Sequence, residues 1–309
     1  MDIAKHFGTY VLPGRIKDPN KGFAEARDAE DIGLGSIWLS ERYGLKEVGV
    51  TCGALSQVTS NARIFGTFYC NIRHPIITAS IANELQHITS GRFGFLLAKG
   101  VPEFLRDLGL PNINFEMLKD FIEITKTLWR GESLSYSGIL GDYPSLRLTD
   151  FSDVPPPPIY ITAIGPKSLD FAGRYCDGVL LHPLLTPEGV EKSSAIVRSA
   201  AEKTGRDPKN ITVCANVLVA PDLPENEFES IIGGRAITYL QAPTLGAAII
   251  RANNWDPSIL EKIKGHHSLA QLNGKLADQE FRKEELIGVA KSIPDAWIKD
   301  GTASGGAES

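Results

Sequence analysis

Polar and charged residues that could line a pocket follow four short apolar runs of this sequence. They are, in chain order, Glu41, Asn71, Lys99 and His182. A carboxylate or an imidazole in a pocket can act as an acid or a base. Each also has a plainer interpretation, because Glu41 and Arg42 could form an ordinary ion pair and His182 could be a satisfied polar cap before Pro183.

A possible anion site lies at Gly165-Pro166-Lys167-Ser168, which follows an apolar run and begins a helical pattern. Free backbone N–H groups at the start of a helix bind anions well, and a glycine lets a phosphate approach the backbone closely. An ordinary turn between a strand and a helix explains the same residues, with Lys167 as a solvated first-turn side chain.

The other candidate groups are weaker. Cys70 is more often a small core residue than a nucleophile, and Arg73-His74-Pro75 fits a turn with a surface ion pair as well as a ligand contact. No catalytic triad spacing, His-x-x-x-His pair or paired Asp box occurs, so we expect no metal site.

The elements that must position these residues alternate along the chain. Strands are expected at 6–12, 36–40, 62–71, 93–99, 159–163, 178–182 and 211–219, and helices at 22–33, 48–58, 76–88, 115–129, 167–175 and 187–204, before a broken helical stretch over 225–297. This alternation predicts parallel βαβ units. No Gly-rich nucleotide loop follows the first strand, so a (β/α)8 TIM barrel with insertions is favoured over a doubly wound sheet. In such a barrel the carboxyl ends of the strands build the active site.

Only seven strands are visible, and the sequence closes with a Gly/Ser-rich stretch over 300–309. Either a further strand lies between Asp222 and Pro294, or the last strand–helix unit is missing; we favour the second interpretation, a truncated chain. We expect one domain over 1–309, with insertions at 131–158 and 221–297 near the barrel mouth. The apolar residues of the second insertion suggest helix packing, or less strongly an apolar substrate or a dimer face; they are Leu240, Leu245, Ile249 and Ile250.

The bulk properties exclude several classes of function. The chain has 309 residues, a net charge of -5 and no basic stripe, so nucleic acid is not an expected partner. No apolar run is long enough to cross a membrane, and no signal peptide is visible, so a cytoplasmic protein is expected. The four cysteines are widely spaced, which indicates reduced thiols and not a disulfide framework or a zinc site.

Four stretches resemble the bacterial luciferase-like family of flavin- and deazaflavin-dependent oxidoreductases. They are AEDIGLGSIWLSERY at 29–43, the stretch 66–100 with its Arg-His-Pro turn, PPPPIYITAIGPKSLDFAGRYCDGVLL at 155–181, and AAEKTGRDPKNITV at 200–213. The resemblance implies a barrel with insertions, a homodimer, a small-molecule substrate and a tricyclic ring cofactor at the mouth. The cofactor would be coenzyme F420 or, alternatively, FMN.

The resemblance also implies roles for residues. The ring would lie against a bulge with a non-proline cis peptide at the end of the third strand, and Ala163, Ile164, Gly165 and Pro166 would hold the cofactor phosphate. Glu41 and His182 would contact the substrate or the ring as catalytic residues. The remaining cofactor-binding residues would be Ser40, Arg42, Thr67, Phe68, Tyr69, Cys70, Asn71, Lys99, Gly100, Lys167 and Ser168.

One departure from the family pattern affects the mechanism. The deazaflavin-using branch often has Asp-His after the second strand, where this chain has Glu41-Arg42. Arg42 stays charged and cannot shuttle a proton, although it suits an anionic cofactor tail. Hydride transfer with F420 is the favoured function. The alternatives are an FMN-dependent monooxygenase with a flavin reductase partner, acting on an apolar substrate, a flavin-binding protein without catalysis, and, least favoured, another phosphate-binding barrel enzyme.

Overall fold

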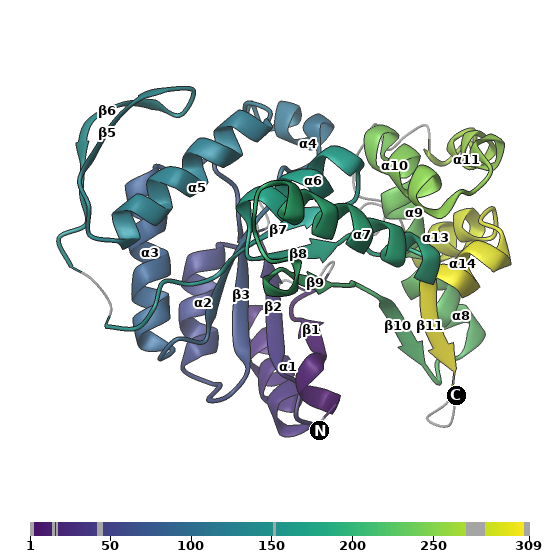
Figure 1. The fold of residues 1–309 in the computed structure, drawn as a ribbon. Coiled ribbons are helices and arrows are strands. Elements are labelled where there is room, and N and C mark those ends of the chain that lie inside the picture. The colour runs from purple at the N-terminus through teal and green to yellow at the C-terminus, as the bar shows by residue number, and fades with distance from the viewer. Residues whose placement is uncertain are drawn as a thin grey trace. The chain divides into compact units, whose positions relative to one another are not determined.

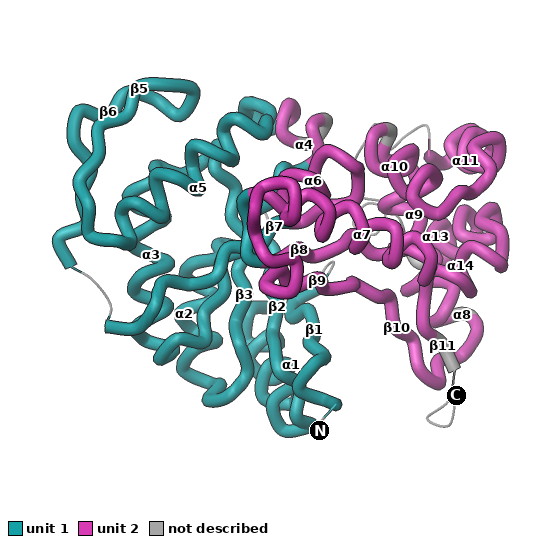
Figure 2. The backbone as a smooth tube through the Cα atoms, viewed as in Figure 1, with its two compact units in different colours: residues 1–100, 108–161, 175–177 teal, residues 101–107, 162–174, 178–309 magenta. Residues whose placement is uncertain are grey.

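The structure is a computed structural model that describes residues 3–13, 16, 18–41, 46–150, 153–269 and 282–305. The chain forms two compact units, which Figure 2 shows in teal and magenta. The first contains residues 1–100, 108–161 and 175–177, and the second contains residues 101–107, 162–174 and 178–309. Arg42 lies outside the described residues, and the expected single domain over 1–309 stays a prediction.

The first unit is built on a parallel sheet with the strand order β1-β2-β3-β4-β7 (Figure 1). Its strands are β1 (Gly8–Tyr10), β2 (Ser36–Ser40), β3 (Arg63–Phe68), β4 (Phe93–Leu97) and the first three residues of β7 (Ile159–Ala163). A short 3-10 helix, η1 (Ile3–His6), precedes β1. Each strand is followed by a helix or a crossover segment, as the alternating pattern predicts.

Four helices connect these strands: α1 (Pro19–Asp31), α2 (Val48–Ser56), α3 (Pro75–Ile88) and α5 (Phe115–Trp129). Their starts follow local chemistry, since Asp18, Glu47, His74 and Asn114 each accept a backbone N–H of the first turn. The helix α3 ends where Ser90 and Gly91 adopt positive φ angles of 52° and 88°.

The stretch 131–158, expected to be an insertion, contains a hairpin. The strands β5 (Leu134–Gly138) and β6 (Gly141–Leu146) pair antiparallel. The hairpin is tied to α5 by the hydroxyl of Tyr136, which donates to Asp120 at 2.6 Å. The turn is closed by Gly141, whose φ of 127° is open to glycine and to few other residues.

The second unit has its own parallel pair, β8 (Gly178–Leu181) and β9 (Thr212–Cys214), beside the last two residues of β7. The second unit also contains the helices α4 (Pro102–Asp107), α6 (Pro166–Tyr175) and α7 (Pro187–Lys203), and the 3-10 helix η2 (Pro208–Asn210) before β9. The last residue of α6 belongs to the first unit. The expected single strand over 211–219 is wrong. It breaks after Cys214, and β10 (Leu218–Pro221) pairs instead with β11 (Thr302–Gly305) in a separate sheet.

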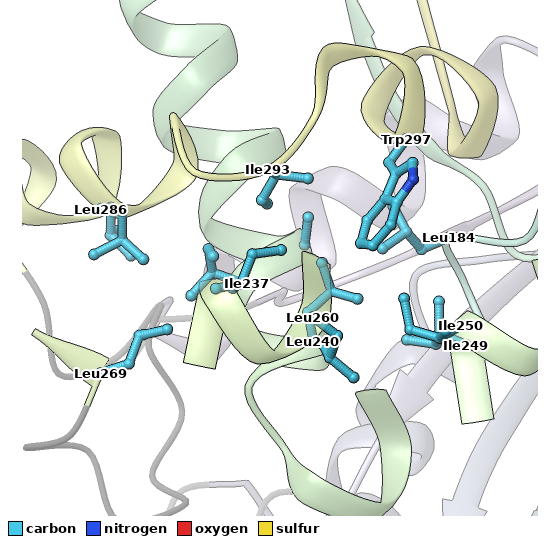
Figure 3. Packing of buried hydrophobic residues seen from close by; sticks show 13 residues of the cluster. Leu184, Ile237, Leu240, Ile249, Ile250, Leu260, Leu269, Leu286, Ile293 and Trp297 are labelled. Carbon is cyan, nitrogen blue, oxygen red and sulfur yellow. The ribbon is translucent and has the colours of Figure 1, made fainter. Parts of the chain in front are cut away.

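The remainder of the second unit is helical (Figure 1). It comprises α8 (Glu225–Phe228), a π-helix η3 (Glu229–Gly233), α9 (Gly234–Leu240), α10 (Pro243–Asn253), α11 (Pro257–Lys264), α13 (Lys283–Ala290) and α14 (Asp295–Gly301). Figure 3 shows the apolar core that these helices share, including Leu240, Ile249, Ile250 and Trp297. The helix-packing interpretation of these residues is therefore confirmed. None of the described helices has the length and hydropathy that crossing a membrane requires.

Candidate functional site

An aromatic layer lies beneath the carboxyl ends of the strands in the first unit. The rings of Trp38 and Phe65 stack at 4.0 Å between centroids, and Tyr160 lies 4.9 Å from Phe65. A side chain on Gly94 would overlap the Phe65 ring, so glycine makes room for the layer. Because side chains alternate along strands, the next residues on this face, Ser40 and Thr67, lie beyond the layer toward the strand ends.

Three polar atoms near this end of β3 are buried and have no hydrogen-bond partner among the described residues. They are Oγ1 of Thr67, Oδ1 of Asn71 and Nε of Arg73. Native proteins rarely leave buried polar groups unpaired, so each such atom is a candidate contact for a ligand or a water molecule. Asn71 is fixed from its other side, since its Nδ2 donates to the carbonyl of Pro111 at 2.7 Å.

Glu41 forms a buried ion pair that the sequence did not reveal. Its Oε2 lies 2.7 Å from the Arg73 guanidinium, which also bonds Glu47 at the start of α2. The Glu41 side chain is only 5% exposed and that of Arg73 is 15% exposed. Burial raises the pKa of the Glu41 carboxyl, and the hydrogen bond and charge of Arg73 oppose that rise without cancelling it. The same surroundings lower the pKa of Glu47, where burial is outweighed by the backbone N–H of Val50 and by Arg73.

The other site residues predicted in the first unit differ in character. Phe68 is a core residue, packed on Phe95 at 4.9 Å and covered by the Arg73 guanidinium at 5.4 Å from its ring. Cys70 is buried, and burial raises the pKa of its thiol to about 12, which excludes a thiolate nucleophile at neutral pH. Lys99 places its ammonium 4.2 Å from the Phe115 ring, and Gly100 turns the chain with φ of 69°.

Two expectations about the end of β3 are wrong. The strand ends at Phe68 and not at Asn71, and Tyr69, which is half-buried, lies in the segment that follows. No peptide bond between described residues is cis, so the bulge with a cis peptide is not present over 67–71.

In the second unit, the turn from β7 to α6 contains the predicted phosphate residues Ala163, Ile164, Gly165, Pro166, Lys167 and Ser168. Space beside Gly165 is open, since an added Cβ would meet nothing within 4 Å. The Gly165 carbonyl accepts the amide of Ser168 at 3.0 Å and its hydroxyl at 2.9 Å. The Ser168 hydroxyl therefore holds the turn, Pro166 supplies no amide hydrogen, and Lys167 is exposed.

His182 follows β8, and its amide bonds the carbonyl of Ala163 at 3.1 Å. The side chain keeps some accessible surface, although protein atoms surround most of it. Burial lowers the pKa of the His182 imidazole to about 4, helped by the positive charge of Arg235 and opposed by the Pro183 carbonyl. His182 is consequently neutral at physiological pH.

The described residues thus form two groups. Ser40, Glu41, Thr67 and Asn71 lie near one another at the strand ends of the first unit, and His182 lies beside the β7–α6 turn in the second. Sequence reasoning named Arg73 but did not select it as a site residue, and it missed Glu47 and Arg235. In the sequence these are single charged residues, which lie after a strand or near the start of a helix. Many protein surfaces have charged residues at such positions, so the pattern alone does not indicate a site.

Comparison with known proteins places the chain in a family. The model of the luciferase-like monooxygenase family matches residues 4–308. A 5,10-methylenetetrahydromethanopterin reductase of Methanolobus tindarius is 30% identical over 217 residues, which make up 68% of this chain and 63% of that protein. A protein of the same name from Archaeoglobus fulgidus is 24% identical over 280 residues, or 90% of this chain and 80% of that protein.

The fold agrees with this assignment. A coenzyme F420-dependent tetrahydromethanopterin reductase of Methanopyrus kandleri has a TM-score of 0.72 at 20% identity, over 97% of this chain and 92% of that chain. The expected luciferase-like barrel class is therefore confirmed. With the family match extending over nearly its whole length, this chain belongs to the luciferase-like monooxygenase family.

Proposed function

We propose that this protein is a coenzyme F420-dependent oxidoreductase that moves a hydride between the deazaflavin and an organic substrate. The observation that carries the proposal is its 30% identity to the Methanolobus reductase, together with a fold similar to an F420-dependent reductase. The alignment spans less than two thirds of the Methanolobus protein, so its substrate is not transferred to this chain. When bound, the deazaflavin supplies the hydride chemistry.

The unpaired atoms at the end of β3 suit the polar edge of such a ring. Flavins and deazaflavins share a cyclic imide edge, which presents two carbonyl acceptors and one N–H donor. Thr67 and Arg73 have unpaired donors in their hydroxyl and Nε–H groups, and Asn71 has an unpaired acceptor in Oδ1. The hydrogen-bonding capacities are therefore complementary in kind and number. The aromatic layer of Trp38, Phe65 and Tyr160 would exclude water beneath the ring.

The two residues proposed as catalytic would act differently. Glu41 has a raised pKa and is fixed by Arg73, so it would orient a polar group of the substrate or ring. His182 is neutral at physiological pH and would accept a hydrogen bond. The β7–α6 turn would hold the cofactor phosphate through backbone amides in the open space beside Gly165, with Lys167 close in sequence.

A Thr67→Val substitution tests this assignment. It removes a buried hydroxyl that has no partner in the described structure, so the free protein should keep or gain stability. Loss of one hydrogen bond should weaken F420 binding by roughly 3- to 10-fold, which corresponds to about 0.5–1.5 kcal/mol. The matched control is Thr125→Val in α5, whose buried hydroxyl bonds the Phe121 carbonyl and which should not change F420 binding. Equal F420 affinity of Thr67→Val and the wild-type protein would contradict the proposed ring contact.

An FMN-dependent monooxygenase is the second candidate. The matching family model is that of luciferase-like monooxygenases, and FMN has the same imide edge as F420. It would need a reductase partner to supply reduced FMN. Tight FMN binding with weak F420 binding would select it. A homodimer also stays a prediction.

A further inference from the structure

The imidazole of His182 is held in one tautomer. Its Nδ1 lies 3.0 Å from the carbonyl oxygen of Pro183. A carbonyl oxygen can only accept, so Nδ1 must carry the hydrogen and, in the neutral ring, Nε2 is left as an acceptor. No described residue donates to Nε2.

The backbone that carries this contact is itself fixed. Leu184 adopts a positive φ of 68°, which a leucine rarely does without support. The support comes from Asn253 at the end of α10. Its Nδ2 donates to the Leu184 carbonyl at 2.8 Å, and its Oδ1 accepts the Thr186 amide at 3.0 Å. The segment after β8 therefore has little freedom to turn the His182 ring.

The helix α9 presents Tyr239 to this ring, and Arg235 of the same helix lies against Tyr239. The Tyr239 ring meets the His182 ring edge-on, with centroids 4.7 Å apart and planes at 83°. The Arg235 guanidinium lies over Tyr239, 5.4 Å from the ring centre, as residues four apart on a helix can. Arg235 thus contacts Tyr239, and Tyr239 in turn contacts His182.

The position of α9 is fixed by packing. The π-helix η3 leads directly into it, and π-helical turns are frequent at functional sites. Gly233 lies so close to Ala290 of α13 that a side chain there would overlap it. Ile237 and Leu240 of α9 enter the apolar core with Leu184, as Figure 3 shows.

Among the described residues, Arg235 is the charged side chain whose field acts on His182. A positive charge near an imidazole disfavours the imidazolium form. The edge-on tyrosine ring and the carbonyl of Pro183 fill two sides of the imidazole, and neither offers the carboxylate that would stabilise a second ring proton.

We propose that Tyr239 and Arg235 are positioning residues that keep His182 neutral with its Nε2 bare, so that His182 accepts a hydrogen bond from an N–H or O–H group of the ligand. The proposal rests on the proposed function only for the identity of that ligand. It makes His182 an acceptor that orients the ligand, and it excludes His182 as a proton donor at neutral pH.

Nitrogen-15 NMR of the histidine-labelled protein tests the proposal directly. The chain has six histidines, and the signals of His182 are those lost in His182→Gln. The expected result is a neutral ring with the hydrogen on Nδ1 from pH 8 down to about pH 5, consistent with a pKa near 4. Protonation of His182 near pH 6.5, or a hydrogen on Nε2 in the neutral ring, would overturn the proposal.

Variants of α9 then test the positioning roles. Arg235→Gln should raise the pKa of His182 toward its ordinary value, whereas Arg251→Gln, an exposed arginine on α10, should not change it. Tyr239→Leu should free the imidazole to turn away from the Pro183 carbonyl, so that both tautomers become populated, and Tyr239→Phe, which keeps the ring, should restore the single tautomer. An unchanged His182 spectrum in both Arg235→Gln and Tyr239→Leu would refute the positioning roles.

Addition of coenzyme F420 separates this proposal from the proposed function. If F420 binds and His182 accepts its hydrogen bond, the Nε2 resonance should shift while the ring stays neutral. If F420 does not bind, the proposed function fails, but the tautomer and pKa of His182 in the free protein still decide the positioning proposal. Binding of F420 that protonates His182 would contradict the acceptor role.

Discussion

Replacing Arg73 with Met would leave Glu41 as a buried carboxylate without its counter-ion. Met preserves much of the apolar stem that packs over Phe68, so the change mainly removes the charge. Removing one partner of a buried ion pair typically costs about 3–5 kcal/mol, whereas exposed pairs contribute about 1 kcal/mol or less. Glu41 is 5% exposed but Glu47 is 45% exposed, so the lost Glu41 contact should dominate. We expect Arg73→Met to lower the free energy of unfolding by about 3 kcal/mol at pH 7.5.

The loss should depend on pH. The pKa of Glu41 is already raised in the folded protein, and Arg73→Met removes two effects that lower it, so the folded-state pKa rises further. A raised folded-state pKa means that the unfolded chain binds fewer protons between the two pKa values, so stability falls as the pH rises through that window. The destabilisation should therefore be small near pH 4.5 and grow toward pH 7.5.

Urea unfolding at the two pH values measures this difference. The double variant Glu41→Gln/Arg73→Met should be more stable at pH 7.5 than Arg73→Met alone, because no unpaired buried charge remains. The control Arg130→Met removes a solvent-exposed pair with Glu132 and should change little. A loss below about 1 kcal/mol for Arg73→Met, or one independent of pH, would refute the reasoning.

Three further outcomes are expected from the first and second units. Gly94→Ala should destabilise the protein by about 1–3 kcal/mol, because a Cβ there overlaps the aromatic layer, while Gly288→Ala on open helix surface should be neutral or stabilising in the same thermal assay. Glu30→Gln should lower stability at pH 7 by about 1 kcal/mol, since the Glu30 carboxylate accepts three backbone N–H groups of the loop 60–62. Burial raises the pKa of Glu30, but the three backbone hydrogen bonds outweigh burial, so the pKa is lowered in the folded protein. The difference in stability between Glu30→Gln and the wild type should therefore vanish as the pH falls through that pKa in acid titrations. Alkylation of Cys52 and Cys70, followed by mass spectrometry at pH 8, should require unfolding, because burial raises the pKa of both thiols.

Local patterns in the sequence located most of the elements. The helix expected at 76–88 is observed as α3 (Pro75–Ile88), because apolar spacing, a proline at the first turn and a Ser-Gly stop all act within the segment. The strand expected at 36–40 is observed as β2, where a short β-branched and aromatic run is buried. These signals depend only on neighbouring residues.

The features that the sequence did not predict depend on contacts between distant segments of the chain. The run 211–219 is mostly apolar, and nothing within it shows that β10 would leave β9 to pair with β11. The hairpin over 134–146 is tied to α5 through Tyr136, and this hydrogen bond joins residues 16 positions apart in the chain. Similarly, the role of Arg73 depends on its ion pairs with the buried Glu41 and with Glu47. These contacts join separate segments and cannot be predicted from residue spacing.

The proposed deazaflavin chemistry is tested most directly by titrating the purified protein with oxidised coenzyme F420 and, separately, with FMN, using fluorescence quenching. The account predicts micromolar F420 binding that is clearly tighter than FMN binding and is weakened by Thr67→Val but not by Thr125→Val. Tighter binding of FMN, or no binding of either ring, would contradict it.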